Sequence, residues 1–286
     1  MTTFEIRDMA QDDIAPAVAM YRAGGWGERR EYLEWMLATP AIQVLVGVRD
    51  GAVVATGMAS IHGSVGWVGS IFVDRTMRSQ GYGRALTDAV CARIDAAGCG
   101  TQALIASPYG KPIYDTMGFR VDAQYQILEA EPLQAAPTPP PHRILRPMTP
   151  ADVDAACALD RRATGEDRRG VIATLAGSGW VLMDSEGVAA SGGKMRGFLV
   201  SILADSATVI APDVDDAAVL LEQLRWLGRG KVKTVKAAVP DIHEAGWRGL
   251  EERGWSPTFQ TPRMLRGATI DWDPTMIWSI LSFCFG

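Results

Sequence analysis

The stretch "RSQGYGRAL", residues 78–86, sets two glycines, Gly81 and Gly83, directly before a segment with the apolar spacing of a helix. Glycine is a poor helix former, so this pair needs a reason other than helix formation. An apolar strand that ends at Val73 precedes the turn, and the free amides of the following helix N-terminus therefore point toward the end of that strand. The two missing side chains also let a ligand approach the backbone closely. The pattern predicts an anion site.

The charges and the residue spacing around the glycines indicate which kind of anion the turn could bind. Arg75, Arg78 and Arg84 supply three cationic groups within ten residues. A dinucleotide loop needs the pattern G-x-G-x-x-G, and a P-loop needs Lys followed by Ser or Thr, and the stretch has neither. The pattern fits a diphosphate bound by backbone amides. Because the same glycine spacing also occurs in plain tight turns, a second motif has to decide between the two.

Alternating strand and helix patterns fill the rest of the first half. Strands are expected at residues 4–7, 43–49, 52–61, 66–73, 102–106 and 119–129, and helices after residues 12–13, around 29–37, and at 83–97 and 111–117. Asp50-Gly51 is typical of a hairpin turn, which makes its neighbouring strands antiparallel. The strand-helix-strand passage from Ser70 to Ala106 instead requires a right-handed parallel crossover. We therefore expect an α/β fold with a mixed, mostly antiparallel sheet and flanking helices.

The chain starts again in its second half. "IRDMAQDDIAPAVAMYRAGGWGERR" from Ile6 and "LRPMTPADVDAACALDRRATGEDRR" from Leu145 run in step without a gap, which favours two copies of one fold. The stretch between the copies holds five of the 16 prolines and should be extended. We predict an N-terminal domain at residues 1–131, a linker at 132–142 and a C-terminal domain at 143–286.

The second copy has the same order of elements. Its strands are expected at residues 180–184, 193–203, 207–211, 232–239 and 256–265, with helices at 215–227 and 242–253. No glycine precedes the helix that begins at Asp215. The anion site is therefore expected in the first copy alone.

Two motifs together resemble a known family. Arg78, Gly81 and Gly83 fit the pattern [RQ]-x-x-G-x-[GA], the acyl-CoA loop of the GNAT superfamily of N-acyltransferases. "ASPYGKPIYDTMGF", residues 106–119, resembles that superfamily's later motif, in which a Tyr on a short helix precedes a Gly-Phe pair. The resemblance covers the N-terminal domain well and the C-terminal domain only as a degenerate copy. The layout is similar to bacterial tandem GNAT proteins, and implies two tandem GNAT-like domains.

The resemblance implies acetyl-CoA, or another acyl-CoA, as co-substrate, without a metal. Its pantetheine arm would enter between the strands at 66–73 and 102–106 and bond to the backbone of Ile71 and Val73, with the Val73 N–H polarising the thioester carbonyl. The expected cofactor-binding residues are Ile71, Phe72, Val73, Arg78, Ser79, Gln80, Gly81, Tyr82, Gly83, Arg84 and Lys111. Only a β-bulge would free the strand amides, and a bulge cannot be read from the sequence.

Tyr114 is the catalytic side chain that the second motif implies. Attack of an amine on a thioester expels a thiolate, which a phenol beside the sulfur can protonate. The alternative is a Tyr that packs against the cofactor or the strand. The corresponding position in the second copy is Leu250, so that copy lacks both the loop and the acid.

The general base cannot be read from the sequence. The strand "GWVGSIFV" carries no acid before Asp74, where many relatives have one. Glu28 and His62 are candidates, although each also fits a solvated charge or a surface imidazole. A water relay without a dedicated side chain stays open.

Tryptophans mark where an acceptor could bind. Trp26, Trp35 and Trp67 lie near segments that line the acceptor groove in the family, so they indicate an aromatic or apolar acceptor unless they belong to the core. Trp272 and Trp278 could close that groove from the second domain or seal the interface between the domains.

The composition bounds partners and location. A net charge of −5 without a strongly basic half argues against nucleic acid. The four cysteines lack metal-type spacing, and the first residues lack the apolar core of a signal peptide, so we expect a cytoplasmic protein. The tail "MIWSILSFCFG", residues 276–286, is shorter than the roughly 20 residues that span a bilayer, and should pack on the body rather than attach to a membrane or a partner. A homodimer stays open.

Three functions fit these observations. The first is an N-acyltransferase that moves an acetyl or other short acyl group to a small-molecule amine. The second is a CoA-binding sensor or interaction protein without turnover. The third, transfer of an aminoacyl group from tRNA, requires a basic surface, which the acidic balance argues against.

Overall fold

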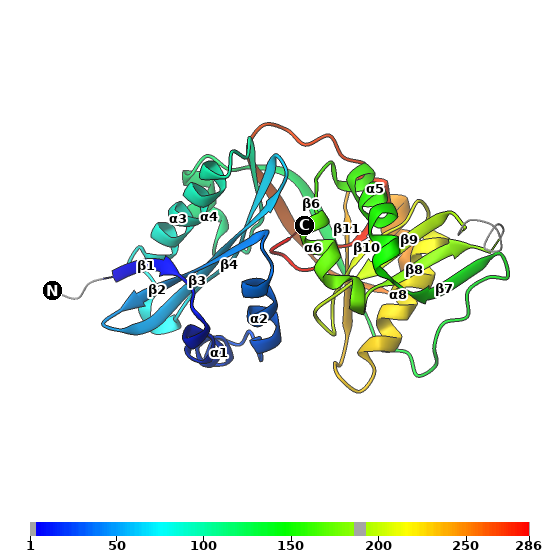
Figure 1. Ribbon diagram of the computed structural model, residues 1–286, viewed down its shortest axis with the longest axis horizontal. Helices are drawn as coiled ribbons and strands as arrows, with labels where there is room; N and C mark the ends of the chain where they lie inside the picture. Colours follow the sequence, from blue (N-terminus) through cyan, green and yellow to red (C-terminus); the bar gives the residue numbers. More distant parts are fainter. Residues whose placement is uncertain (1–3, 186–192, 286) are drawn as a thin grey trace.

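The computed structural model describes residues 4–185 and 193–285. The chain forms two halves that lie side by side, and its C-terminus returns between them (Figure 1). The first half contains β1 (Phe4–Asp8), α1 (Ile14–Ala23), α2 (Arg30–Ala38), β2 (Ile42–Arg49), β3 (Ala52–His62), β4 (Val65–Val73), α3 (Tyr82–Ala96), β5 (Thr101–Ile105), α4 (Lys111–Thr116) and β6 (Arg120–Ala130).

The second half repeats this order. It contains β7 (Arg143–Pro147), α5 (Val153–Thr164), α6 (Arg169–Leu175), β8 (Trp180–Asp184), β9 (Met195–Val200), β10 (Thr208–Ile210), α8 (Val214–Gly228), β11 (Val235–Pro240), α9 (Glu244–Glu251) and β12 (Ser256–Gly267), and β13 (Ile277–Ser279) follows in the tail. The strands and helices predicted from the sequence are all found, with ends that differ by a few residues. Asp50 and Gly51 both have positive φ, 51° and 81°, as the predicted two-residue hairpin turn requires.

The repeated sequence makes the same contacts in both halves. Arg7 donates two hydrogen bonds to the carboxylate of Asp13, at 2.6 and 2.8 Å, and Arg146 donates two to Asp152, at 2.8 and 2.7 Å. In each pair the arginine hydrogen bonds hold the pKa of the carboxyl below its usual range. The internal repeat is therefore a repeat of structure.

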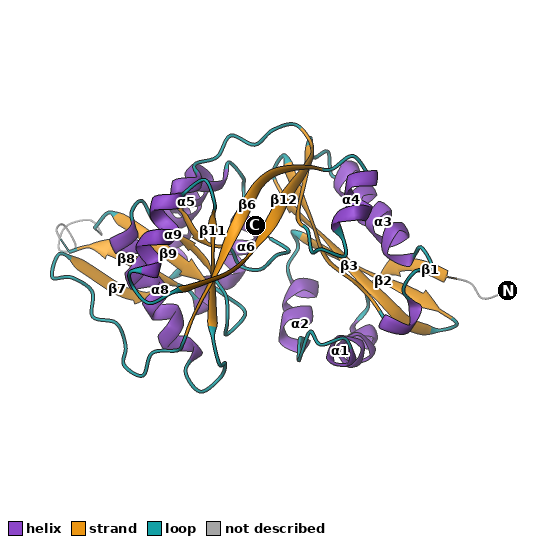
Figure 2. Ribbon diagram, turned by 180° about the vertical axis from the view of Figure 1, so that it is seen from behind, coloured by secondary structure: helices purple, strands orange, loops and turns teal. Residues whose placement is uncertain are grey.

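The strands form two sheets, and the larger sheet contains strands from both halves. An eight-stranded sheet has the order β1-β2-β3-β4-β5-β12-β6-β11, and a five-stranded sheet has the order β13-β10-β9-β8-β7. β4 and β5 run parallel, as predicted for the crossover, with Val65–Trp67 opposite Thr101–Ala103. Each half gives its last strand to the other, because β12 lies beside β5 and β6 lies beside β11 (Figure 2).

Helix α3 packs closely on the first half's strands, and this contact positions the glycine loop. Figure 1 shows α3 and α4 on one side of these strands and α1 and α2 on the other. The approach depends on glycine in the sheet, since a Cβ at Gly66 would lie only 2.2 Å from Cγ2 of Ile94, and one at Gly57 would press on Leu86 and Val90. Leu86, Val90 and Ile94 of α3 are all fully buried.

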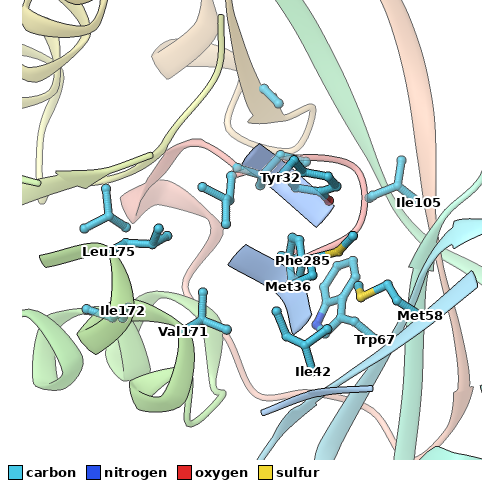
Figure 3. Packing of buried hydrophobic residues seen from close by; sticks show 14 of the residues in the cluster. Tyr32, Met36, Ile42, Met58, Trp67, Ile105, Val171, Ile172, Leu175 and Phe285 are labelled. Atoms are coloured by element: carbon cyan, nitrogen blue, oxygen red, sulfur yellow. The ribbon is translucent and has the colours of Figure 1, made fainter. Parts of the chain in front are cut away.

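One apolar core runs through both halves. Phe285, near the C-terminus, lies among Tyr32 and Met36 of α2, with Val171 and Ile172 of α6 on the side of the second half (Figure 3). Burying an aromatic side chain contributes about 1.5–3 kcal/mol, so this residue stabilises the contact between the halves. The tail packs on the body, as the sequence predicted.

Candidate functional site

A β-bulge interrupts β4 where it faces the cavity. Thr56 of β3 lies opposite Phe72 and Met58 lies opposite Gly69, so one residue of β3 opposes both Ser70 and Ile71. Ser70 has the positive φ of 50°. The bulge that the sequence could not reveal is present. It turns the Ser70 N–H out of the ladder.

Beyond the bulge, β4 diverges from β5. The two strands pair only at Val65–Trp67, and we call the space between them beyond that point the first-half gap. The amide of Asp74 donates to the carbonyl of Val54 on β3 at 2.9 Å. By the alternation of an antiparallel ladder, the N–H groups of Ile71 and Val73 then face away from β3, toward the gap.

The glycine loop leads from this gap into α3. Ser79 and Gly81 have positive φ, 62° and 83°. The first helical hydrogen bond runs from the amide of Ala85 to the carbonyl of Gly81, at 3.0 Å. The amides of Tyr82, Gly83 and Arg84 therefore precede the helical ladder and are free to bind an anion.

The predicted cations surround the loop. Arg78 is exposed, and its Nε donates to the Val73 carbonyl at 3.3 Å. Arg75 donates to the carbonyl of Gly24, and Arg84 to the carboxylate of Asp88. Within the described part of the chain, Arg75 and Arg78 have no carboxylate partner, so their charge is available to an anion. The side-chain carbonyl of the predicted residue Gln80 accepts a hydrogen bond from Arg49. The ring of Tyr82 stacks on Phe4, with ring centroids 4.0 Å apart. Phe72 is buried against the rings of Tyr21 and Trp26.

An open cavity of about 900 Å³ begins at the first-half gap and extends between the halves. Its first-half lining includes Tyr21, Trp26, Arg29, Tyr32, Ser70, Ile71, Ser107, Lys111 and Tyr114. Its second-half lining includes Leu203, Asp205, Ser206, Lys236, Phe259, Thr261, Ser282, Phe283 and Cys284. Of the predicted cofactor-binding residues, Ile71 and Lys111 line this cavity, whereas Phe72, Val73 and the loop from Arg78 to Arg84 lie outside its lining. The second half contributes the other residues of the wall named above.

Tyr114 lies on α4 at the inner end of this cavity. Burial raises the pKa of its phenol to about 12, so the hydroxyl stays protonated at neutral pH. Its ring packs edge-on against Phe119. Gly110 makes room for it, since a Cβ there would lie 2.7 Å from the Tyr114 ring. Lys111, on the same helix, pairs with Asp115 at 2.9 Å.

The two predicted candidates for the general base lie outside the cavity lining. His62 is buried between Ser60 and Glu166 of the second half, with its Nδ1 2.7 Å from the Glu166 carboxylate. Glu28 is exposed and pairs with Arg22. The structure therefore does not bring either side chain to Tyr114.

The tryptophans divide between cavity and core. Trp26 lines the cavity, whereas Trp67 is fully buried and donates to Glu166 at 2.8 Å. Trp35 packs on Phe285. Trp278 is also buried, inside the second half, and Trp272 stacks under the guanidinium of Arg263. Of the five, Trp26 alone lines the cavity.

Sequence reasoning did not find the second half's contribution to the cavity. Asp205 is the one carboxylate among the described lining residues, and its carboxylate lies 3.9 Å from Nζ of Lys236. Ser282, Phe283 and Cys284 come from the tail, which the sequence marked only as apolar. No local pattern marks these residues, because their neighbours in space are far away in the chain.

No group of His, Cys, Asp or Glu side chains in residues 4–185 and 193–285 could hold a metal ion. In the same ranges, every helix is too short or too polar to cross a membrane.

A known protein family matches part of the first half. Residues 27–129 match the family model of the acetyltransferase (GNAT) domain. No curated protein sequence is significantly similar to the chain.

Solved structures share the fold over nearly the whole chain. A candidate acetyltransferase from Pyrococcus horikoshii has a TM-score of 0.81 and 18% identity, over 99% of this chain and 96% of that one. A tandem GNAT protein from the clavulanic acid biosynthesis pathway has a TM-score of 0.65 and 15% identity, over 94% and 100%. A GCN5-related N-acetyltransferase from Sphaerobacter thermophilus has a TM-score of 0.61 and 17% identity, over 94% and 98%. Residues 27–129 are thus similar to the acetyltransferase (GNAT) domain, and the chain as a whole shares the fold of a tandem GNAT protein.

Proposed function

We propose that this protein is an N-acyltransferase that moves an acetyl or other short acyl group from acyl-CoA to the amine of a small molecule. The observation that carries the proposal is one cavity in which the first-half gap, the bulge of β4 and the buried phenol of Tyr114 meet. The donor binds to the first half, and the acceptor enters from the side that the second half lines.

The glycine loop binds the donor's diphosphate. The amides of Tyr82, Gly83 and Arg84 donate to the phosphate oxygens, while the guanidinium groups of Arg75 and Arg78 supply positive charge. The pantetheine arm then runs along β4, where the N–H groups of Ile71 and Val73 face the gap.

The chemistry is a direct transfer. The amine nitrogen attacks the thioester carbonyl, whose oxygen accepts a hydrogen bond from a β4 amide, Val73 N–H being the assigned donor. The new C–N bond forms, the C–S bond breaks, and the hydroxyl of Tyr114 gives its proton to the departing sulfur. The amine loses one proton to water, and the Tyr114 phenolate regains a proton from water, so the cycle closes; Asp205 is the one carboxylate among the described cavity-lining residues.

The competing function is a CoA-binding protein without turnover. It draws support from the absence of His62 and Glu28 from the cavity lining, which leaves no strong base beside Tyr114 among the described residues. The buried, protonated phenol of Tyr114 favours acyl transfer, because a protein that only binds CoA does not need a buried acid in this cavity.

Release of free CoA thiol separates the two functions. Wild-type protein is incubated with acetyl-CoA and a panel of amines, and each reaction is repeated with the Tyr114→Phe variant. A transferase releases thiol only when a suitable amine is present, and loses most of that rate in the variant. Tight CoA binding by calorimetry together with no amine-dependent thiol release across the panel would instead support the sensor.

A further inference from the structure

The tail occupies the place in the second half that corresponds to the first-half gap. By element order, β10 and β11 correspond to β4 and β5. They do not pair with each other. Instead β13 pairs antiparallel with β10, with Val209 opposite Ser279 and Ile210 opposite Ile277, and its other edge contacts β11. The chain itself fills the second-half gap.

The side chains of β13 fix it firmly there. Ile277, Trp278 and Ser279 are all buried. The indole N–H of Trp278 donates to the carbonyl of Ala211 at 3.0 Å, and its ring packs edge-on against His243. A ligand could enter this gap only by displacing a fully buried tryptophan.

The helix N-terminus beside this gap is also satisfied from within. Asp213 is the N-cap of α8, and its carboxylate accepts the amide of Asp216 at 2.9 Å. Arg196 pairs with Asp213 and with Asp216. The turn before α8 thus carries carboxylates, whereas the corresponding turn of the first half carries free amides and arginines. The second-half turn therefore does not attract a phosphate.

Beyond β13 the tail crosses to the first half. Ser206 holds the Leu281 carbonyl at 3.1 Å, and the hydroxyls of Tyr32 and Ser282 are 3.3 Å apart. Phe285 is buried and packs edge-on against the ring of Tyr32 (Figure 3) and against the ring of Trp35. The segment is thus held at both ends, with residues 282–284 between the two anchors.

These middle residues face the cavity. Ser70 donates its bulge amide to Cys284 Sγ at 3.1 Å, and a Cβ at Gly69 would lie 2.5 Å from the Cβ of Cys284. Phe283 is 40% exposed and meets Phe259, itself 49% exposed, with ring centroids 6.5 Å apart. Both rings line the cavity.

Exposed aromatic side chains concentrate at this place. Among the described residues, six large apolar side chains are strongly exposed, and three of them, Trp26, Phe259 and Phe283, line the cavity. Exposed apolar surface gathered in one concave site is typical of a surface that binds an apolar ligand.

We propose that the second half's former cofactor gap serves as the anchor of the C-terminal segment, and that Ser282–Cys284 form the wall that selects an amine with an apolar or aromatic body. This inference rests on the proposed function, because it concerns the acceptor of that reaction. Phe283 is the specificity-determining residue, since its ring is exposed to the cavity and is not needed to hold the tail.

The test measures acceptor binding without turnover. Calorimetry is performed on protein saturated with CoA, which has no acyl group to transfer, with phenethylamine and ethylamine as probes. The variants are Phe283→Ala and a chain that ends at Leu281. Ile242→Ala is the control, because Ile242 is 73% exposed and lies outside the cavity lining.

Wild type and Ile242→Ala should bind phenethylamine more tightly than ethylamine. Phe283→Ala should weaken phenethylamine binding about tenfold, as expected for a lost apolar contact in a pocket, and leave ethylamine binding and the affinity for CoA unchanged. The shortened chain should lose the preference as well. If it does not fold, Phe283→Ala decides alone, because removal of a largely exposed ring leaves the core intact.

The inference is overturned if Phe283→Ala binds both amines as wild type does, or if wild type binds neither amine. Phenethylamine that binds as expected, while no amine of the panel is acetylated, would uphold the tail as a wall that selects amines and overturn the proposed function. The two failures are therefore distinguishable.

Discussion

The sulfur of Cys284 lies 3.1 Å from the backbone nitrogen of Ser70, so the end of the second half touches the bulge of β4 in the first. The two residues are 214 positions apart in the sequence. The first half alone has the glycine loop and Tyr114, but part of the wall of the cavity comes from the C-terminal segment, which the second half anchors.

Tyr114→Phe should lower kcat by roughly one hundredfold or more, because a lost general acid typically costs 10² to 10⁴ in rate. KM for the acyl donor should change little, since the contact acts chiefly while charge develops on sulfur. The matched control is Tyr109→Phe, because Tyr109 is 87% exposed just before the same helix. Steady-state kinetics under conditions where chemistry limits the rate decide the matter, and a near-normal kcat for Tyr114→Phe would assign Tyr114 to packing.

The pH dependence of kcat should follow the raised pKa of Tyr114. Burial raises that pKa to about 12, so the phenol keeps its proton well above the range in which an exposed tyrosine, with a pKa of about 10, would lose it. We expect kcat at saturating amine to stay level up to about pH 10.5. A decline of kcat centred near pH 10 in wild type, and missing from Tyr114→Phe, would contradict the buried setting of the phenol.

Gly83→Val should weaken CoA binding by at least about tenfold and change stability little. Gly83 does not have positive φ, and a Cβ there would meet Cγ2 of Val73 at 3.6 Å, an ordinary contact. The added methyl groups would stand over the amides that bind the diphosphate. Gly100→Val is the control, because a Cβ at Gly100 meets nothing within 4 Å. Calorimetry with CoA and thermal unfolding provide the two readouts, and an unchanged CoA affinity in folded Gly83→Val would remove the loop from the site.

Gly81 differs from Gly83 in its backbone conformation. Its φ of 83° lies in the left-handed region, where a residue with a side chain costs about 1–2 kcal/mol. Gly81→Val should therefore lose stability as well as CoA affinity, which makes Gly83 the cleaner test of binding.

Wild-type protein should bind one CoA per chain. β13 fills the second-half gap, and the carboxylate of Asp213 caps the helix beside it, so the described residues of the second half do not repeat the phosphate site of the first half. Isothermal titration calorimetry should give a stoichiometry near one, and Gly83→Val should weaken this single binding event. Two equivalent sites per chain would show that the second half also binds the cofactor.

Glu166→Gln should destabilise the protein by about 2–4 kcal/mol near neutral pH, since it removes the charge from a buried hydrogen-bonded group. Burial alone would raise the pKa of the Glu166 carboxyl, but the hydrogen bond and charge of His62, with Arg168 and the Trp67 N–H, lower it overall. A carboxyl with a lowered pKa stabilises the fold above its unfolded value of about 4.3, and this stabilisation is lost as pH falls through the folded value.

Denaturant unfolding of wild type and Glu166→Gln at several pH values checks this expectation. The difference in free energy of unfolding between them should be full at pH 7 and shrink below about pH 4.3. The exposed Glu252→Gln serves as the control. A difference that does not depend on pH would mean that the carboxylate's charge does not stabilise the contact between the halves.

The sequence by itself determined the features that depend on near neighbours in the chain. The hairpin at Asp50-Gly51 and the loop at Gly81 follow from backbone conformations that glycine adopts at little cost. The strand and helix order follows from hydrophobic spacing, and the repeat follows from a constant offset that places Arg7 with Asp13 and Arg146 with Asp152. Tyr114 could be proposed from the sequence because its motif lies on one short helix.

The tertiary structure decided the rest. The apolar pattern of a strand shows that one of its faces is buried, but not which strand lies beside it, so the exchange of β6 and β12 and the placing of β13 beside β10 could not be read from the chain. His62 and Glu28 fitted a base by their chemistry, yet His62 pairs with Glu166 of the second half and Glu28 pairs with Arg22 of its own half. The bulge at Ser70 and the contact with Cys284 exist only because packing brings distant residues together, and for that reason the acceptor side of the cavity belongs to the fold rather than to any motif.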